Sequence, residues 1–296
     1  MKISMNLGPA LRVFGAEKAI ELYKKAGFEA YDFSFFEYID HDWRTGGAIV
    51  LKPDSPLMGE DYLTYAKSLR AYADSLGISC NQTHAPFPIS NPTLAGRMPW
   101  SLEVSAILGA NHCVIHPDNN LGAEGNAAFY RTLLPLAKEL GVKIATENMW
   151  NWTRGTSGQG KEFDHALPAA CSDPASFQAH LRAVNDPYLV ACLDIGHAEM
   201  YGLGTSAVEL IHALGKDMEV LHVHDNDLWN DNHAEPFTMS IDFDAVVAAL
   251  REVGYAGDMT LEVGANFSAD DEAGALATLT RFADTAKRLR EMFEQK

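Results

Sequence analysis

Residues 138–148 read KELGVKIATEN and contain the unit from which the chain is built. A helical segment ends at Gly141, a β-like run follows at 143–148, and near its end stands the carboxylate of Glu147. Glycine adopts the left-handed conformation at a helix end at little cost, and the chain then enters a strand. The same junction recurs in KKAGFEAYDF, DSLGISC and REVGYAGDMTL, so the sequence predicts repeated helix-to-strand units.

Eight β-like runs alternate with segments in which apolar residues have helical spacing. The runs are 2–7, 30–36, 78–84, 112–117, 143–148, 189–196, 219–225 and 258–264. The helical segments are 16–26, 60–76, 94–108, 124–140, 173–185, 205–214, 243–253 and 270–293. Eight such units predict an α/β fold, a closed parallel (β/α)8 TIM barrel formed as a single domain by residues 1–296. A doubly wound open sheet is the alternative, and the lack of a glycine-rich phosphate loop after the first run disfavours it.

Composition limits the classes of partner. A net charge of −17 over 296 residues opposes binding to phosphate backbones, so no nucleic-acid partner is expected. No apolar run approaches the ~20 residues that span a bilayer, so we expect no membrane partner. The first residues do not read as a signal peptide, and the four cysteines form no CxxC pair, so we expect a cytoplasmic protein.

Six consecutive β-like runs end in a side chain that can bind a divalent metal. In chain order these side chains are His84, His116, Glu147, Asp194, His222 with His224, and Glu262, and His197 follows shortly after Asp194. The carboxyl ends of barrel strands meet at one mouth, and imidazole with carboxylate suits zinc, manganese, iron or cobalt better than calcium. Each residue alone could equally be a solvated or capping group, but the joint pattern favours a metal site. Buried glutamates need a partner, and these strand ends offer no lysine or arginine.

The motifs THAPF, IHP, ATEN, LDIGH, HVHDND and LEV, in this order and spacing, resemble the xylose-isomerase-like TIM barrel superfamily. That superfamily contains sugar isomerases and 3-epimerases, inosose-processing enzymes and the endonuclease-four class of apurinic-site nucleases. The resemblance implies one metal held by Glu147, Asp194, His222 and Glu262, with Glu147 and Glu262 as the catalytic acid/base pair. The nuclease branch implies additional ligands at His84, His116, His197, Asp231 and His233. His224 lies one pleat repeat from His222, so either histidine could be the ligand.

The resemblance implies a divalent-metal-dependent sugar or cyclitol isomerase or epimerase, or a related lyase, of carbohydrate metabolism. Such an enzyme removes a proton next to a metal-chelated carbonyl and passes through an enediolate. Its cofactor would be manganese, cobalt, zinc or magnesium, and its partner a small-molecule sugar or cyclitol. The alternatives are an endonuclease-four-like apurinic-site phosphodiesterase with a multi-zinc site, and a barrel that binds a ligand without catalysis.

Two aromatic residues are candidates for substrate binding. Trp150 follows the strand-end glutamate in NMWNWTRG, and Phe87 follows His84 in THAPF. Aromatic faces suit the apolar faces of sugars, although Trp150 could equally anchor its long loop. Arg154 and Lys161 in that loop could recognise a phosphate group. We expect a homo-oligomer, as in many sugar-acting relatives.

Overall fold

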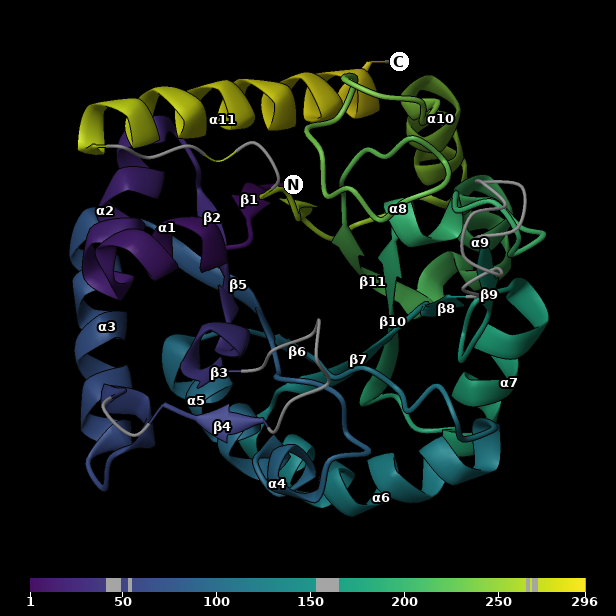
Figure 1. The fold of residues 1–296 in the computed structure, drawn as a ribbon, viewed down its shortest axis with the longest axis horizontal. Coiled ribbons are helices and arrows are strands. Elements are labelled where there is room, and N and C mark those ends of the chain that lie inside the picture. Colours follow the sequence, from purple (N-terminus) through teal and green to yellow (C-terminus); the bar gives the residue numbers. More distant parts are fainter. Residues whose placement is uncertain (41–48, 53–54, 153–164, 265–266, 268–270, 296) are drawn as a thin grey trace, which may run out of the picture.

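A computed structural model describes residues 1–40, 49–52, 55–152, 165–264, 267 and 271–295. Within this part of the chain, parallel strands form an inner ring and helices surround it (Figure 1). Each ring strand overlaps one of the eight predicted runs and is shorter than predicted. They are β1 (Ile3–Met5), β2 (Ala30–Ser34), β5 (Ser79–His84), β6 (His112–Val114), β7 (Lys143–Glu147), β10 (Leu189–Asp194), β11 (Met218–His222) and β12 (Met259–Leu261).

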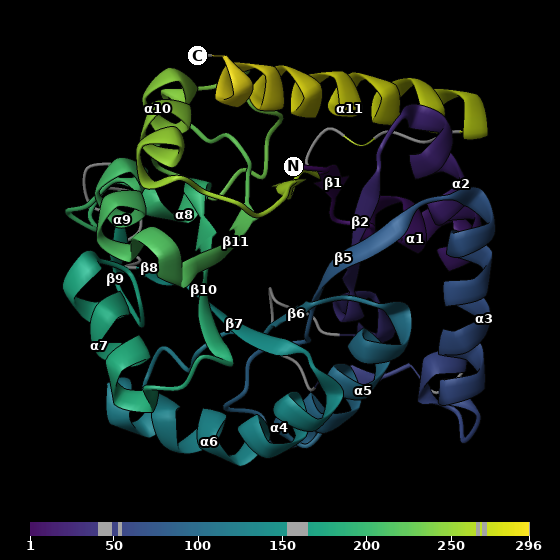
Figure 2. The same ribbon diagram turned by 180° about the vertical axis from the view of Figure 1, so that it is seen from behind.

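Two seams close the ring. Six strands make one sheet in the order β11-β10-β7-β6-β5-β2, and β1 pairs with β12. At one seam the Leu7 amide donates to the Asp32 carbonyl at 2.8 Å, and at the other the Val223 amide donates to the Thr260 carbonyl at 2.9 Å. The same order around the ring is seen from behind (Figure 2). The predicted α/β barrel is therefore confirmed, and the open doubly wound sheet was the wrong alternative.

The helices of the outer ring follow the predicted segments. They are α2 (Ala16–Ala26), α3 (Tyr62–Leu76), α5 (Met98–Leu108), α6 (Ala123–Leu140), α7 (Pro174–Val184), α9 (Ala207–Leu214), α10 (Phe243–Val253) and α11 (Glu272–Glu294). Gly141 follows α6 with φ 70°, as the glycine at this junction predicts. Asp173 caps α7 by accepting from the amides of Ala175 and Ser176. None of the helices in the described residues is both long and apolar enough to cross a membrane.

Several short elements differ from the prediction. The single helix expected at 94–108 is two helices, α4 (Pro92–Ala95) and α5, because Gly96 interrupts the segment and Pro99 lies in the first turn of α5. The run at 189–196 ends as a strand at Asp194, where α8 (Ile195–Ala198) begins. A short helix that was not predicted, α1 (Gly8–Phe14), follows β1. These elements are too short for a helical period to show in the sequence.

The two long connections carry hairpins that periodicity did not predict. One holds β3 (Ile39–Asp40), paired antiparallel with β4 (Val50–Leu51). The other holds β8 (Trp150–Trp152), paired antiparallel with β9 (Ala166–Pro168). Three 3-10 turns, η1 (Phe35–Tyr38), η2 (Pro56–Met58) and η3 (Gly215–Asp217), complete the described connections. Arg154, Lys161 and their segment lie outside the described residues. That residues 1–296 form a single domain stays a prediction.

The barrel interior below the mouth is apolar on one side. Alternate residues of β6, β7, β10 and β11 point inward and form one buried cluster: Val114, Ala145, Val190, Cys192 and Val220. All four cysteines of the chain are buried and free of disulfides.

The opposite side of the interior is polar and hydrogen-bonded. Gln82 donates to Asp32 Oδ2 at 3.3 Å and accepts from the hydroxyl of Thr260 at 3.2 Å. Asn81 donates to the same hydroxyl at 3.0 Å and accepts from Ser4 at 2.7 Å. This network belongs to β1, β2, β5 and β12, and it supports Asp32 directly below the site described next.

The connection between β11 and α10 is organised by one buried carboxylate. Asp225 is fully buried, and its oxygens accept from the backbone amides of Asn226, Met239, Ser240 and Ile241 at 2.7–3.1 Å. Its own amide and carbonyl also pair with Ala234. Because this carboxylate joins both ends of the connection, the backbone of residues 226–241 depends on it.

Asp225→Ala should lower the free energy of unfolding by about 3 kcal/mol or more. The substitution removes the charged acceptor to which several backbone amides donate and leaves those amides without a hydrogen bond. Urea unfolding followed by circular dichroism measures the loss. Asp217→Ala, on an exposed turn, is the matched control and should change stability by less than about 0.5 kcal/mol. Equal losses in the two variants would contradict the role given to Asp225.

Candidate metal centre

The carboxyl ends of the strands bring all ten sequence-predicted ligand candidates to one mouth. His84, Glu147, Asp194 and His222 are the last residues of β5, β7, β10 and β11. His116, His224 and Glu262 lie one or two residues beyond their strands, His197 lies in α8, and Asp231 and His233 lie in the β11–α10 connection. The register places Asp194 beside His222 on neighbouring strands.

Four of these residues form a group at the centre of the mouth, here called the glutamate cluster: Glu147, Asp194, His222 and Glu262. His222 Nδ1 lies 3.2 Å from Glu147 Oε2 and 3.3 Å from Glu262 Oε2. One ligand atom from each residue lies within 4.8 Å of the others, the spacing that a shared cation requires. These are the four residues for which the family resemblance implied one metal.

Asp32 is a site residue that the sequence prediction missed. Its Oδ2 lies 3.2 Å from His222 Nε2, and both side chains are fully buried. A ring nitrogen engaged by a carboxylate fixes the tautomer, so His222 presents Nδ1 to the glutamates. Asp32 stands inside the run AYDFSFF rather than at its end, and a charged residue within an apolar strand was the signal that could have identified it.

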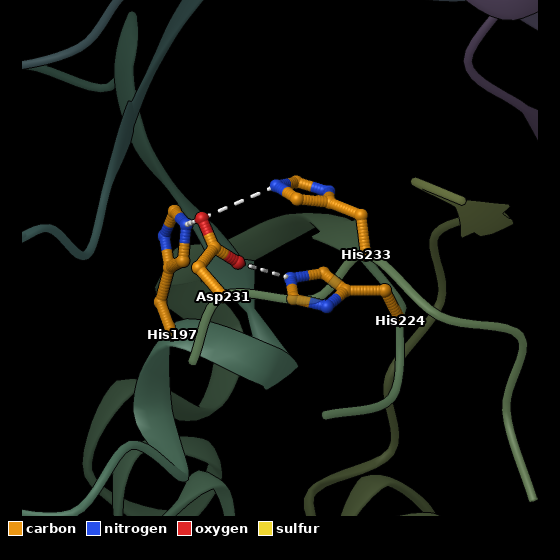
Figure 3. A group of neighbouring side chains, drawn as sticks. All are labelled: His197, His224, Asp231 and His233. Atoms are coloured by element: carbon orange, nitrogen blue, oxygen red, sulfur yellow. Dashed lines mark hydrogen bonds and ion pairs between the residues drawn. The ribbon is translucent and has the colours of Figure 1, made fainter. Parts of the chain in front are cut away.

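A second group, here called the histidine cluster, contains His197, His224, Asp231 and His233 (Figure 3). The carboxylate of Asp231 lies between the three rings, with Oδ2 3.3 Å from His197 Nε2 and 3.2 Å from His233 Nε2. His224 Nε2 lies 3.5 Å from Asp231 Oδ1. Of the two histidines that the sequence left open, His222 therefore faces the two glutamates, whereas His224 Nε2 lies 3.1 Å from Asp194 Oδ1 and 3.5 Å from Asp231 Oδ1.

A third group joins His84 and His116 to Glu147. The Nε2 atoms of the two rings are 2.9 Å apart, and His116 Nε2 lies 3.2 Å from Glu147 Oε2. The ring of Phe87 stacks on His116 with centroids 4.4 Å apart, and Phe36 stacks on Phe87 at 4.8 Å. Phe87, a predicted substrate contact, therefore covers this pair of histidines.

The donor set fits divalent cations. Within the described residues, the ion pairs of Glu147, Asp194 and Asp231 are all with histidines. Five buried ligand atoms make no hydrogen bond with any described residue: Glu147 Oε2, Asp194 Oδ2, His222 Nδ1, His224 Nε2 and Asp231 Oδ1. A buried polar atom without a partner costs about 1–3 kcal/mol. These atoms belong to the glutamate cluster and the histidine cluster, and cations bound in the two clusters would satisfy them.

The neighbours of each side chain separate their pKa values. Burial would raise the pKa of Glu147, but the imidazoles of His116 and His222 outweigh burial and hold it well below its usual range. Burial raises the pKa of Glu262, where the negative charges of Glu147 and Asp194 add to the effect. Burial and the facing His116 lower the pKa of His84 to about 3, so its ring is neutral and available as a ligand. The pKa values of the two glutamates are thus shifted in opposite directions.

A cavity of about 950 Å³ opens above these groups. Its lining includes Glu147, Glu262, His197 and His233, with the aromatic rings of Phe87 and Trp150 on the walls. Trp150 lies in β8, at a ring-centroid distance of 6.4 Å from His197. The structure thus brings both aromatic candidates to the cavity that the ligand groups share.

Three further histidines, His112, His180 and His212, make ordinary contacts within the fold. His112 pairs with Glu219 at 2.9 Å near the opposite end of the barrel, and His212 pairs with Glu252 at 2.9 Å on the outer helices. His180 contacts the Ser176 carbonyl within α7. His41 lies outside the described residues.

The fold and this mouth define a class: a parallel (β/α)8 barrel with histidine and carboxylate groups, able to hold cations, at the carboxyl ends of its strands. The chain belongs to the Xylose isomerase-like TIM barrel family, whose model matches residues 20–285. An uncharacterized protein of Methanocaldococcus jannaschii is 27% identical in an alignment 197 positions long that covers 60% of this chain and 62% of that protein. The aligned part thus spans less than two thirds of that relative.

Solved structures share the fold over nearly the whole chain. A D-psicose 3-epimerase, determined in the presence of D-fructose, matches with a TM-score of 0.69 at 13% identity, covering 98% of this chain and 99% of that one. The IOLI protein, determined with a zinc atom, matches with a TM-score of 0.67 at 17% identity, covering 99% and 98%. At these identities the likeness shows the fold.

The charge on the histidine cluster can be tested in protein freed of metal with a chelator. Burial would lower the pKa of His233, but Asp231 outweighs burial and raises it to about 10. Removing that charge with Asp231→Asn should bring the pKa of His233 down toward that of an ordinary histidine. NMR titration of ring nitrogens measures it, with the exposed Asp217→Asn as the control that leaves it unchanged. If the pKa of His233 stays the same in the Asp231→Asn protein, the charge of Asp231 is not what raises it.

Proposed function

We propose that this chain is a divalent-metal-dependent sugar or cyclitol isomerase or epimerase, or a related lyase. The observation that carries the proposal is the pair of glutamates at the mouth, Glu147 and Glu262, which contact one histidine ring between them and line the same cavity. The structural neighbours include sugar epimerases, which supports the reaction class.

The glutamate cluster is the proposed metal site, with Glu147, Asp194, His222 and Glu262 as ligands. Its unsatisfied buried atoms and its ligand types suit manganese, cobalt, zinc or magnesium. A divalent ion held there would polarise the carbonyl of the substrate and stabilise negative charge on its oxygen atoms. Asp32 acts as a positioning residue, because it orients His222 from the side away from the cluster.

The two glutamates have the separated pKa values that an acid and a base require. Glu147 keeps its charge and is the group that removes the proton from the carbon next to the carbonyl, leaving an enediolate. Glu262 holds a proton more readily and is the group that returns one to the substrate. If the two act on opposite faces of that carbon, the product is an epimer.

The cavity supports a small polyhydroxylated substrate. Its lining combines carboxylates and carboxamides, such as Asn119 and Asn151, with aromatic walls at Phe87 and Trp150. Carboxamides exchange hydrogen bonds with hydroxyl groups, and rings suit the apolar face of a sugar. The assignment of Arg154 and Lys161 to a substrate phosphate, and the homo-oligomeric state, stay predictions.

A phosphodiesterase acting at apurinic sites is the second candidate. It is favoured by one observation: the His84 and His116 rings converge on Glu147, as the nuclease resemblance implies. The net charge of −17 opposes the approach of DNA, and among the residues that line the described cavity Arg12 is the single lysine or arginine. We therefore propose the sugar chemistry and expect no nucleic-acid partner.

Glu147→Gln and Glu262→Gln should each lower turnover by about 1,000-fold or more, because each removes one half of the proton relay. The assay uses Mn²⁺-loaded protein in D₂O with ketoses, inososes and 3-oxo-glycosides, and follows product and deuterium incorporation by NMR. Glu252→Gln, which changes an outer-surface glutamate, is the matched control and should retain wild-type turnover. Turnover by Glu262→Gln within tenfold of the wild-type rate would contradict the two-glutamate mechanism.

Duplex DNA with a single abasic site separates the two candidate functions. Zinc-loaded protein should leave it uncut, because a net charge of −17 opposes the approach of the phosphate backbone. Nicking is read on a denaturing gel over a series of salt concentrations. Cleavage that rises as salt is lowered and disappears in Glu147→Gln would make the nuclease the correct assignment.

A further inference from the structure

We infer that the histidine cluster is a separate, structural zinc site in which His224 is the fourth protein ligand and closes the coordination sphere. Three of its members, His197, Asp231 and His233, match positions of the nuclease branch, whereas His224 is outside that pattern. The inference concerns this cluster alone, and it stands whether or not the glutamate cluster carries out sugar chemistry.

The spacing of the ligand atoms is that of a tetrahedral zinc site. Zinc binds imidazole nitrogen and carboxylate oxygen at about 2.0–2.2 Å, so neighbouring ligand atoms of a tetrahedron lie ~3.3 Å apart. Asp231 Oδ2 lies 3.3 Å from His197 Nε2 and 3.2 Å from His233 Nε2, and the other oxygen of the same carboxylate, Oδ1, lies 3.5 Å from His224 Nε2. All four ligand atoms lie within 4.8 Å of one another.

All three rings are turned so that Nε2 faces the centre of the cluster (Figure 3). The Nδ1 atom of His197 lies 3.0 Å from the Asn148 carbonyl, and that of His233 lies 2.9 Å from the Glu262 carbonyl. His224 Nδ1 lies 3.4 Å from the Asp225 carbonyl. A carbonyl beside Nδ1 selects the tautomer with its proton there and leaves the Nε2 lone pair for a metal.

His224 is buried without a hydrogen bond at its inward nitrogen. Its side chain is fully buried, and neither its Nε2 nor the facing Asp231 Oδ1 has a hydrogen-bond partner in the part of the chain that the structure describes. Asp194 Oδ1 lies 3.1 Å from the same nitrogen, but the contact is not aligned as a hydrogen bond. Two unsatisfied buried atoms that point at each other across 3.5 Å are explained by an ion between them.

Gly196 makes room for this ring. A β-carbon at position 196 would lie 1.9 Å from His224 Cε1 and 2.4 Å from both ring nitrogens, so any other residue would displace the ring. Gly196 immediately precedes His197, so one short helix supplies both a ligand and the space for another. The position of the His224 ring therefore depends on a glycine at residue 196.

The ligands come from three segments: α8, the residues just after β11, and the β11–α10 connection. Four protein ligands leave no position for water or substrate, which is the arrangement of a structural rather than a catalytic zinc site. A zinc ion here would fasten the connection to α8 beside the cavity. The glutamate cluster would remain the part of the mouth that is open to substrate.

Zinc binding and cobalt spectroscopy on the chelator-stripped full chain test the inference without any sugar. Wild-type protein should bind zinc in the histidine cluster, and Co²⁺ there should show the intense visible absorption of tetrahedral coordination. His224→Asn should weaken zinc binding at this site by about 100-fold or more and abolish that absorption. Circular dichroism of the metal-free variant establishes that it is folded.

Matched variants make each result decisive. Gly196→Ala leaves all four ligands in the sequence but displaces the His224 ring, so it should cause the same two losses. Glu147→Gln should keep the tetrahedral cobalt absorption, and so should His212→Asn on the outer helices. The inference is overturned if wild type lacks that absorption, or if folded His224→Asn or Gly196→Ala keeps it with wild-type zinc affinity. If His224→Asn does not fold, Gly196→Ala and His233→Asn decide the question by the same measurement.

Discussion

The mouth of this barrel is governed by carboxylates that are buried together with histidines. Asp32, Glu147 and Asp194 are almost completely buried, and Glu262 and Asp231 lie beside them. Ionised carboxylates this close repel one another strongly where water is scarce, and imidazoles relieve that repulsion in part. The parallel barrel creates the constraint, because it directs the carboxyl end of every strand to one place. The separated pKa values, the unsatisfied ligand atoms and the fit to cations all follow from this crowding.

Much of the barrel could be predicted because its signals are local. Helix ends such as Gly141 and apolar alternation in the strands each depend on a few neighbouring residues. The candidate ligands were predictable for a geometric reason, because a closed parallel barrel places the last residue of every strand at the same mouth. The convergence of Glu147, Asp194 and His222 is therefore a consequence of the fold, whereas their catalytic and metal-binding roles remain predictions.

What the sequence could not supply depends on contacts between distant residues. Asp32 reaches His222 across 190 positions, so no local pattern marks the pair. The choice between His222 and His224 depends on which strand neighbour each ring meets, and the chain alone left it open. The hairpin β8–β9 and the helix α8 are set by their surroundings, because elements of three or four residues carry too little periodicity to be recognised.

The polar side of the barrel interior limits how this chain can change. Gln82, Thr260, Asn81 and Ser4 are linked by hydrogen bonds, and Gln82 also supports Asp32. An apolar substitution at one of them would fill the same volume yet leave its partners without donors or acceptors. On the apolar side, exchanges such as valine for isoleucine can be accepted singly. On the polar side, substitutions have to occur in concert, so this half of the interior should vary more slowly during evolution and resist redesign by volume alone.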